Sequence, residues 1–365
     1  MKNWRDQRLQ RIWELVTKGQ RIGSDEGLYL YEHAPLGYLS NLADRVNKRL
    51  NNGKVWFNRN MHIEPTNICI YHCRFCSYSR KFNEPGAWEM NLDQILEQID
   101  QSHDTHLTEV HIVGGVHPQR GLEFYEEMIR EIKLRHPNLL IKAFTAVELD
   151  FMFRKSRVGV KEGLIRLKKA GLDAIPGGGA EIFDETLRAY LCPDKADSDT
   201  WLAIHREAHK LDIPTNATML YGHLESYKHR VDHLNRLRDL QDETSGFQAF
   251  IPLKYRKENN LLSDIGETST VEDLRNYAIS RIYLDNFIHL KAYWPMIGRE
   301  VAALSLSFGV DDLDGTIQDT TRIYSMAGAE DQNPTMTTDE LITLIRQSGC
   351  QAVERDTLYR TVKIY

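Results

Sequence analysis

The sequence lacks any apolar run long enough to cross a membrane, and it lacks a surplus of basic residues. A membrane helix needs roughly 20 consecutive apolar residues, and no segment approaches that length. The first residues, Met1 to Asp6, form no apolar signal region. Acidic residues outnumber basic ones by 52 to 46, and the net charge of −6 argues against a nucleic-acid partner. We therefore expect a cytoplasmic protein with neither a membrane nor a nucleic-acid partner.

Cysteine is scarce, and its distribution excludes a disulfide framework. The 365 residues include five cysteines, and three of these lie within eight positions. Cys192 and Cys350 are isolated from the others. An odd, clustered set of thiols fits a reducing compartment in which the thiolates stay available to bind metal.

The cluster itself is Cys69, Cys73 and Cys76, with the spacing C-x3-C-x2-C and Phe75 directly before the last cysteine. Soft thiolates this close together suit zinc or an iron–sulfur cluster. A structural zinc site usually has a fourth Cys or His nearby, and the one local candidate is His72. His72 is adjacent to Cys73, a spacing that is strained for two ligands of one tetrahedral ion. A four-iron cluster on three thiolates leaves one iron open for chemistry. A zinc knuckle or a chance cluster of cysteines is the alternative.

Nucleotide-binding fingerprints are absent, although glycine does gather at two places. No Walker A pattern occurs, and the run Pro176 to Glu181 fails the G-x-G-x-x-G pattern at Ile182. The three glycines 177–179 make sense where backbone amides pack against a ligand. The pair Gly114 and Gly115 directly follows a predicted strand, where it either admits a ligand or forms a turn.

The rest of the chain alternates between strand and helix patterns. We expect a helical N-terminal extension over 1–60, which packs on a barrel over 61–365 in a single overall domain. Strands are predicted over 110–113, 139–144, 173–175, 213–219, 247–251 and 287–292, with a possible last one over 307–310. Right-handed βαβ units then predict an α/β fold, a TIM-type (β/α) barrel that is complete or nearly complete. A C-terminal hairpin is expected over 351–365.

Residues suited to chemistry follow the predicted strands. Those at or just past the strand ends are Cys69, Gly114, Glu148, Gly178, Thr218 and Gln248. In a barrel these ends share one face, and that face carries the active site. His223, in the loop after the predicted strand 213–219, is either a substrate or acid–base group or an ordinary loop histidine. Asp312 belongs to an acidic run, 311–314, that suits a divalent ion or a polar substrate.

The C-x3-C-x-F-C pattern after a strand resembles the cluster motif of radical S-adenosylmethionine (SAM) enzymes. The resemblance implies a [4Fe–4S] cluster on Cys69, Cys73 and Cys76, with SAM chelating the open iron. It places the backbone of Gly114 and Gly115 at the methionine amino group, although Val116 departs from the family's third residue. It also implies SAM contacts from Phe75, Glu148, Gly178, Glu181, Lys195 and Met219. Glu181 would meet the ribose, unless it is a solvated carboxylate at a helix start.

Longer segments, such as 142–148, 176–183, 214–223, 242–253 and 311–317, resemble the aminofutalosine synthases of menaquinone biosynthesis. In that family the adenosyl radical adds to the enol ether of 3-[(1-carboxyvinyl)oxy]benzoate, carboxyl carbon is lost, and SAM is consumed to give 6-amino-6-deoxyfutalosine. The resemblance implies a flavodoxin- or ferredoxin-type electron donor. Candidates for substrate contacts are His117, Thr145, Gln248 and Asp312, with His223 and Gln248 as candidate catalytic groups. Alternatives are a dehypoxanthine futalosine cyclase-like or deazaflavin-synthase-like enzyme that releases 5′-deoxyadenosine, and a non-enzymatic, metal-stabilised binding protein.

Overall fold

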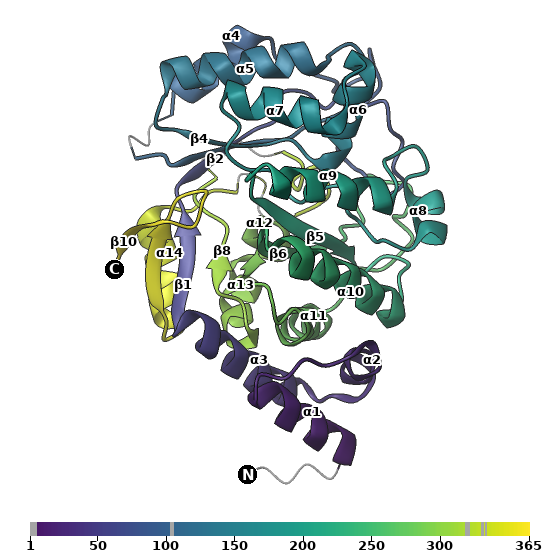
Figure 1. Cartoon of the computed structure of the whole chain (residues 1–365), viewed down its shortest axis with the longest axis vertical. Coiled ribbons are helices and arrows are strands. Elements are labelled where there is room, and N and C mark those ends of the chain that lie inside the picture. The colour runs from purple at the N-terminus through teal and green to yellow at the C-terminus, as the bar shows by residue number, and fades with distance from the viewer. Residues whose placement is uncertain (1–5, 103–105, 318–321, 330–331, 333) are drawn as a thin grey trace.

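The structure, a computed structural model, describes residues 6–102, 106–317, 322–329, 332 and 334–365. Parallel strands form the centre of the molecule and helices cover them (Figure 1). The helices are α1 (Gln7–Thr17), α2 (Ser24–His33), α3 (Leu36–Asn51), α4 (Leu92–Asp100), α5 (Leu122–Arg135), α6 (Ala146–Ser156), α7 (Val160–Ala170), α8 (Glu185–Leu191), α9 (Ser198–Lys210), α10 (Tyr227–Thr244), α11 (Thr270–Tyr283), α12 (Trp294–Ile297), α13 (Arg299–Ser305) and α14 (Thr338–Gln347). The strands are β1 (Lys54–Asn58), β2 (Asn60–Ile63), β3 (Glu109–Ile112), β4 (Leu140–Ala143), β5 (Thr215–Tyr221), β6 (Phe247–Lys254), β7 (His289–Ala292), β8 (Asp312–Leu313), β9 (Gln351–Arg355) and β10 (Thr361–Ile364).

The strands form a TIM-like partial barrel, which confirms the predicted α/β class. One sheet has the order β2-β3-β4, and the other has the order β10-β9-β1-β8-β7-β6-β5. Two isolated parallel bridges, Lys142 to Ala174 and Ile175 to Thr215, join β4 to β5. At the other edge the Thr316 hydroxyl donates to the Asn60 carbonyl at 2.8 Å, so a side chain takes the place of strand pairing there.

Two predicted strands differ from the structure. The segment 173–175 forms one isolated bridge with each neighbour and is not a regular strand, since each of its two ladders is a single pair long. The strand predicted over 307–310 is wrong: Leu306–Phe308 is a 3-10 helix, and β8 follows at Asp312–Leu313. Gly309 lies between them with a φ of +92°, a left-handed conformation that ends the helical turn and is unsuited to a strand.

Helix starts were readable from capping boxes, in which two side chains each bond the other's backbone N–H. Asn91 and Gln94, an N-x-x-Q pattern in the sequence, form such a box at α4, and Thr337 and Glu340, a T-x-x-E pattern, form one at α14. The box of Thr145 and Glu148 starts α6, a helix that the sequence analysis did not predict. The same pair therefore places Glu148 at the end of β4, on the first turn of a helix.

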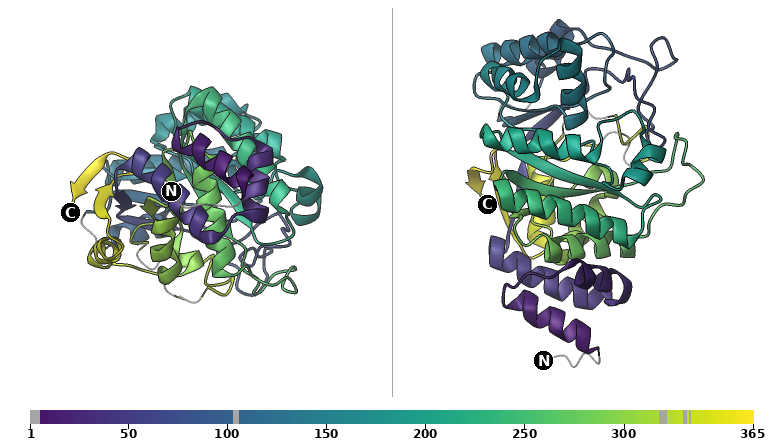
Figure 2. Two further views of the ribbon diagram at one scale, coloured as in Figure 1. Left: turned by 90° about the horizontal axis from the view of Figure 1, so that it is seen from below. Right: turned by 45° about the vertical axis from the view of Figure 1, so that its right-hand side comes forward.

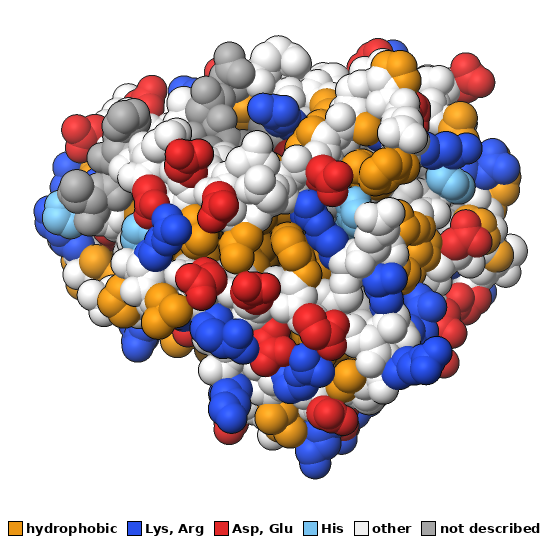
Figure 3. Space-filling model, turned by 90° about the horizontal axis from the view of Figure 1, so that it is seen from above, with side chains coloured by type: hydrophobic (Ala, Val, Ile, Leu, Met, Phe, Trp, Pro, Cys, Tyr) orange, Lys and Arg blue, Asp and Glu red, His pale blue; other side chains and the backbone are white. Residues whose placement is uncertain are grey.

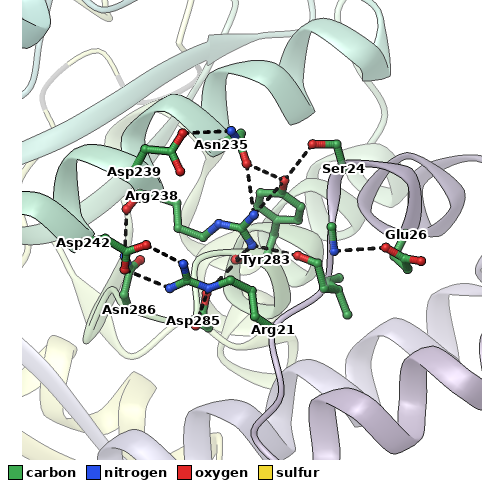
Figure 4. A network of polar contacts seen from close by, with 12 residues as sticks. Arg21, Ser24, Glu26, Asn235, Arg238, Asp239, Asp242, Tyr283, Asp285 and Asn286 are labelled. Carbon is green, nitrogen blue, oxygen red and sulfur yellow. Dashed lines mark hydrogen bonds and ion pairs between the residues drawn. The ribbon is translucent and has the colours of Figure 1, made fainter.

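The N-terminal helices lie at one end of the molecule, opposite α4, α5 and α7 (Figures 1 and 2). Helix α3 packs against α11, and α2 packs against α10. Arg21 links this part to the barrel through ion pairs with Asp242 and with Asp285, the latter at 2.9 Å (Figure 4). Arg238 donates to the Ile22 carbonyl at 2.9 Å in the same network. These contacts lie where α10 and α11 end, so the extension covers the ends at which β6 and β7 begin.

The predicted C-terminal hairpin is present as antiparallel β9 and β10. Strand β9 also pairs in parallel with β1, from Lys54 opposite Gln351 to Asn58 opposite Arg355. Arg355 reaches across β1 to Asp312 of β8 and donates two hydrogen bonds, at 2.7 and 3.0 Å, to the Asp312 carboxylate. Both side chains are fully buried, so this pair ties the hairpin to the barrel.

The surface carries interspersed charges of both signs, from 46 basic and 52 acidic residues in the chain. On the face drawn in Figure 3, acidic and basic side chains alternate without a large patch of one sign. None of the helices in the described part of the chain combines the length and apolar character needed to cross a bilayer.

We predict that Arg355→Met destabilises the protein by about 3–5 kcal/mol, because it removes both hydrogen bonds to the buried Asp312 carboxylate and leaves it only the more distant Lys291 ammonium, at 3.7 Å. The double variant Arg355→Met, Asp312→Asn removes both charges and is expected to recover most of this loss. Denaturant unfolding of the apoprotein measures both effects. Arg130→Met, which breaks the exposed Arg130–Glu126 pair, is the control and should cost less than about 1 kcal/mol. Equal losses in the single and double variants would contradict the account.

Candidate active site

One pocket opens where the parallel strands end. It is lined by the loops that follow the strands and by inward-facing residues of the strands themselves. Eleven of the predicted site residues line this pocket: Cys69, Cys73, Phe75, Cys76, Gly114, Gly115, Thr145, Glu148, Gly178, Glu181 and Lys195. Segments far apart in the sequence therefore meet at this one place.

The cysteine loop is fixed by backbone hydrogen bonds from three directions. The Cys69 N–H donates to the Arg80 carbonyl at 3.0 Å, and the Ile70 N–H donates to the Val116 carbonyl at 3.1 Å. The Arg74 N–H donates to the carbonyl of Leu191, at the end of α8, at 2.8 Å. The three thiols are free and face the same pocket. Their common orientation is thus set before any ligand binds.

The environment of the thiols indicates a cluster site. Burial raises the pKa of the Cys69 and Cys73 thiols, so these ligands lose their protons on binding metal. A single ion holds its thiolates about 2.3 Å away, and no three His, Cys, Asp or Glu among the described residues could hold one ion. Each thiolate of a four-iron cluster binds a different iron, so such ligands stand further apart. Three free thiols that line one pocket suit the three protein ligands of a four-iron cluster.

Gly114 and Gly115 allow the cysteine loop to approach β3. A β-carbon at Gly115 would lie 2.4 Å from the Ile68 carbonyl oxygen, and one at Gly114 would lie 2.8 Å from the Thr66 carbonyl oxygen. The Gly115 N–H donates to that same Thr66 carbonyl at 2.7 Å. The glycines are therefore required by the chain's own backbone, in addition to any contact with a ligand.

Glu148 is a buried carboxyl group held by its surroundings. Its two oxygens accept hydrogen bonds from the Gly114 N–H at 3.1 Å and from the Thr145 N–H and hydroxyl, each at 2.7 Å. Burial opposes ionisation more than these donors favour it, and it raises the pKa of Glu148 to about 7. A carboxyl with this pKa can accept a proton or a charged amine near neutral pH.

Glu181 and Lys195 form a second polar pair on the pocket wall. The Lys195 Nζ lies 2.6 Å from Glu181 Oε1 and 5.2 Å from the centre of the Phe75 ring. Glu181 has a φ of +48°, so the turn after the three glycines points it into the pocket and it does not start a helix. Gly178 also lines this wall. A β-carbon there would lie 2.8 Å from the Thr145 side chain, so the site requires a glycine and its backbone faces the pocket.

Below the loops, polar side chains of the strands form the floor of the pocket. His62, His111 and Lys142 are direct neighbours across β2, β3 and β4. The His62 and His111 rings stack with their centres 4.6 Å apart. Burial, and then the neighbouring His62, lowers the pKa of His111 to about 3, so this ring is neutral. Lys291 of β7 and Asp314, just past β8, complete the floor with an ion pair at 3.1 Å.

Sequence reasoning missed this floor, although a signal was present. Lys142 and Lys291 are single charged residues in the apolar runs 139–144 and 287–292. A charge within a strand that is buried on both faces can only point to the interior of the barrel, where a polar ligand compensates it.

Five predicted site residues do not line the pocket. Gln248 is the second residue of β6 and lies at the opposite end of that strand. Met219 is fully buried in β5 and faces away, because its neighbours Thr218 and Leu220 take the inward positions of the alternating strand. Asp312 is held by Arg355, and Asp314 lines the pocket in its place.

The two predicted histidines are engaged outside the pocket. His117 is buried with its Nε2 3.1 Å from a Glu89 carboxylate oxygen, and its Nδ1 accepts from the Gln119 N–H at 3.2 Å. His223 accepts from the Leu224 N–H at 2.7 Å and lies 3.3 Å from Glu225. These contacts fold the loops that carry the two residues.

Comparisons with known proteins agree with this geometry. The model of the radical SAM superfamily matches residues 63–237, and that of the CofH/MqnC C-terminal region matches residues 244–364. An aminodeoxyfutalosine synthase from Thermus thermophilus is 43% identical over 100% of this chain and 99% of its own length. A cyclic dehypoxanthine futalosine synthase from Streptomyces coelicolor is 37% identical over 98% of this chain and 90% of its own. The crystal structure of methylornithine synthase shares the fold, with a TM-score of 0.72 at 15% identity over 93% of this chain and 95% of that one.

The partial barrel and the three-thiol pocket at its strand ends define a radical SAM enzyme. Within that superfamily the chain belongs to the CofH/MqnC family. Membership of the superfamily implies a [4Fe–4S] cluster and SAM as cofactors.

We predict that Glu148 makes the stability of the apoprotein depend on pH. Its folded pKa of about 7 lies above its ordinary 4.5, so the folded state binds more protons between these values and stability falls as pH rises. Between pH 4 and pH 8 the wild type should lose about 3 kcal/mol relative to Glu148→Gln. Denaturant unfolding at both pH values measures the difference. A difference between the two proteins that stays constant with pH would contradict the assignment.

Proposed function

We propose that the enzyme joins the adenosyl group of SAM to an aromatic enol ether, 3-[(1-carboxyvinyl)oxy]benzoate. The products are 6-amino-6-deoxyfutalosine and methionine, with loss of the carboxyl carbon, as in aminodeoxyfutalosine synthases of menaquinone biosynthesis. The observation that carries the proposal is similarity over the full length, at 43% identity, to a relative of that name.

The residues of the pocket suit the two cofactors. Cys69, Cys73 and Cys76 would hold a [4Fe–4S] cluster, which with SAM supplies a 5′-deoxyadenosyl radical when both are bound. Glu148 lies beside the Gly114 and Gly115 backbone, where its carboxylate can receive the methionine ammonium group. Glu181 can accept hydrogen bonds from ribose hydroxyls, with Lys195 at 2.6 Å holding it in place.

The pocket also meets the physical needs of a reactive substrate. Apolar side chains line its walls, among them Val113, Val147, Ile251, Leu253 and Met296. Such walls exclude water and limit side reactions of a radical. Polar groups line both the cofactor side and the floor, so the two ends of the pocket can bind two polar ends of one substrate.

A second candidate function is that of a cyclase, because a cyclic dehypoxanthine futalosine synthase is 37% identical over nearly the whole chain. The fate of the adenosyl group separates the two functions. A synthase incorporates it into the product, whereas an enzyme that abstracts hydrogen releases 5′-deoxyadenosine.

The electron donor and the compartment are also part of the proposal. We propose a flavodoxin- or ferredoxin-type donor, since the cluster must be reduced at low potential. All five cysteines are free, which fits the reducing environment of the cytoplasm.

We predict that the reconstituted protein, incubated anaerobically with SAM, reductant and the enolpyruvyl benzoate, forms an adenosyl adduct detectable by mass spectrometry. Cys73→Ala should lose bound iron and lower activity by at least about 100-fold, because the cluster loses a ligand. Cys350→Ala is the matched control, because Cys350 does not line the pocket, and it should keep iron and activity. Release of 5′-deoxyadenosine without an adduct would instead support the cyclase.

A further inference from the structure

The floor of the pocket carries a buried ammonium group with hydrogen-bonding capacity to spare. The Lys142 side chain is 1% exposed, and its Nζ lies 2.9 Å from a Glu109 carboxylate oxygen. Despite this short distance, the Nζ makes no hydrogen bond of acceptable geometry among the described residues. Lys142 lines the pocket, whereas Glu109 does not. An ammonium has three N–H donors, so donors remain for a ligand in the pocket.

A second buried polar group lines the same pocket from β5, which the segment 173–175 joins to β4. Asn216 of β5 is 2% exposed and lines the pocket, and its Oδ1 has no hydrogen-bond partner in the described part of the chain. A side-chain amide can present either its oxygen or its nitrogen to a ligand by rotation. Leaving such buried groups unpaired is costly, so the floor is built to receive a polar group from a ligand.

The charges around the floor define which polar group fits. Lys142 is paired with Glu109. Lys291 lies 3.1 Å from Asp314 and 3.7 Å from Asp312, and Arg355 also holds Asp312. The carboxylates of Glu109, Asp312 and Asp314 are thus already matched by cations. The Lys142 Nζ keeps N–H donors to spare, and the Asn216 amide can turn its nitrogen toward an anion by rotation. A planar carboxylate accepts two or more hydrogen bonds, and it matches donors that come from β4, β5 and β7.

We propose that Lys142, together with Asn216 and Lys291, binds the ring carboxylate of the aromatic substrate. The inference rests on the proposed function and identifies the end of the substrate that lies deepest. The thiols, Glu148 and Glu181 occupy the loops past the strand ends, whereas Lys142 and Lys291 lie one residue before the ends of β4 and β7. The double bond that receives the adenosyl group therefore faces the cofactors, and the benzoate carboxylate reaches the floor.

Calorimetric titration tests this binding without turnover. The reconstituted enzyme with SAM, but without reductant, is titrated with 3-[(1-carboxyvinyl)oxy]benzoate and with 2-phenoxyprop-2-enoate, which lacks only the ring carboxylate. The wild type should bind the benzoate at least about 10-fold more tightly, the range of a charge-assisted hydrogen bond. No preference in the wild type would overturn the inference.

Two variants test whether Lys142 and Asn216 bind the ring carboxylate. Lys142→Met combined with Glu109→Gln removes both buried charges and should reduce the preference to within about 3-fold. Asn216→Asp keeps the side-chain volume but places a like charge at the floor, so it should weaken benzoate binding at least about 10-fold and spare the phenoxy acid. If both variants keep the wild-type preference, Lys142 and Asn216 have only a structural role and the inference is wrong.

A matched control removes a similar ion pair elsewhere. Lys133 and Asp173 lie 2.7 Å apart and do not line the pocket, so Lys133→Met with Asp173→Asn should keep the full preference. A general effect of losing an ion pair would reduce the preference in this variant too. Failure of the proposed function itself would appear separately, as a wild-type enzyme that forms no adenosyl adduct from the benzoate.

Discussion

The close contact between the cysteine loop and the end of β3 is the constraint on which the site depends. Gly114 and Gly115 leave no room for a side chain, because carbonyl oxygens of residues 66 and 68 occupy the space. Hydrogen bonds from the Gly115 and Ile70 N–H groups then fix the loop on both sides of this contact. The three thiols consequently face the pocket in a loop whose backbone is already satisfied.

From that contact the pocket divides into two regions with different chemistry. The loops past the strand ends supply thiols, glycine backbone and the carboxylates Glu148 and Glu181, which suit a metal cluster and a charged nucleoside. The inward-facing strand residues supply a neutral histidine stack and buried ammonium groups, which suit the far end of an acidic substrate. Apolar walls between the two regions keep water from the reacting atoms.

Much of this could be predicted from the sequence, since the decisive patterns are local. The cysteine spacing, the strand-then-glycine pairs and the capping boxes each involve residues a few positions apart, and the α/β alternation follows from periodicity. Predictions failed for residues whose place in the site depends on contacts between segments far apart in the sequence. Gln248 lies at the start of β6, whereas the pocket lies at the end of that strand. Asp312, a candidate substrate contact, instead pairs with Arg355, which is 43 residues away in the sequence. The polar floor was not predicted, because His62, His111 and Lys142 become neighbours only when β2, β3 and β4 pair in register.

The state of the cluster tests the central claim most directly. We predict that the anaerobically reconstituted and reduced protein contains about four irons and gives a [4Fe–4S]⁺ electron paramagnetic resonance spectrum that changes when SAM is added, because one iron has no protein ligand. A colourless protein that contains zinc, or a cluster spectrum that SAM leaves unchanged, would contradict the account.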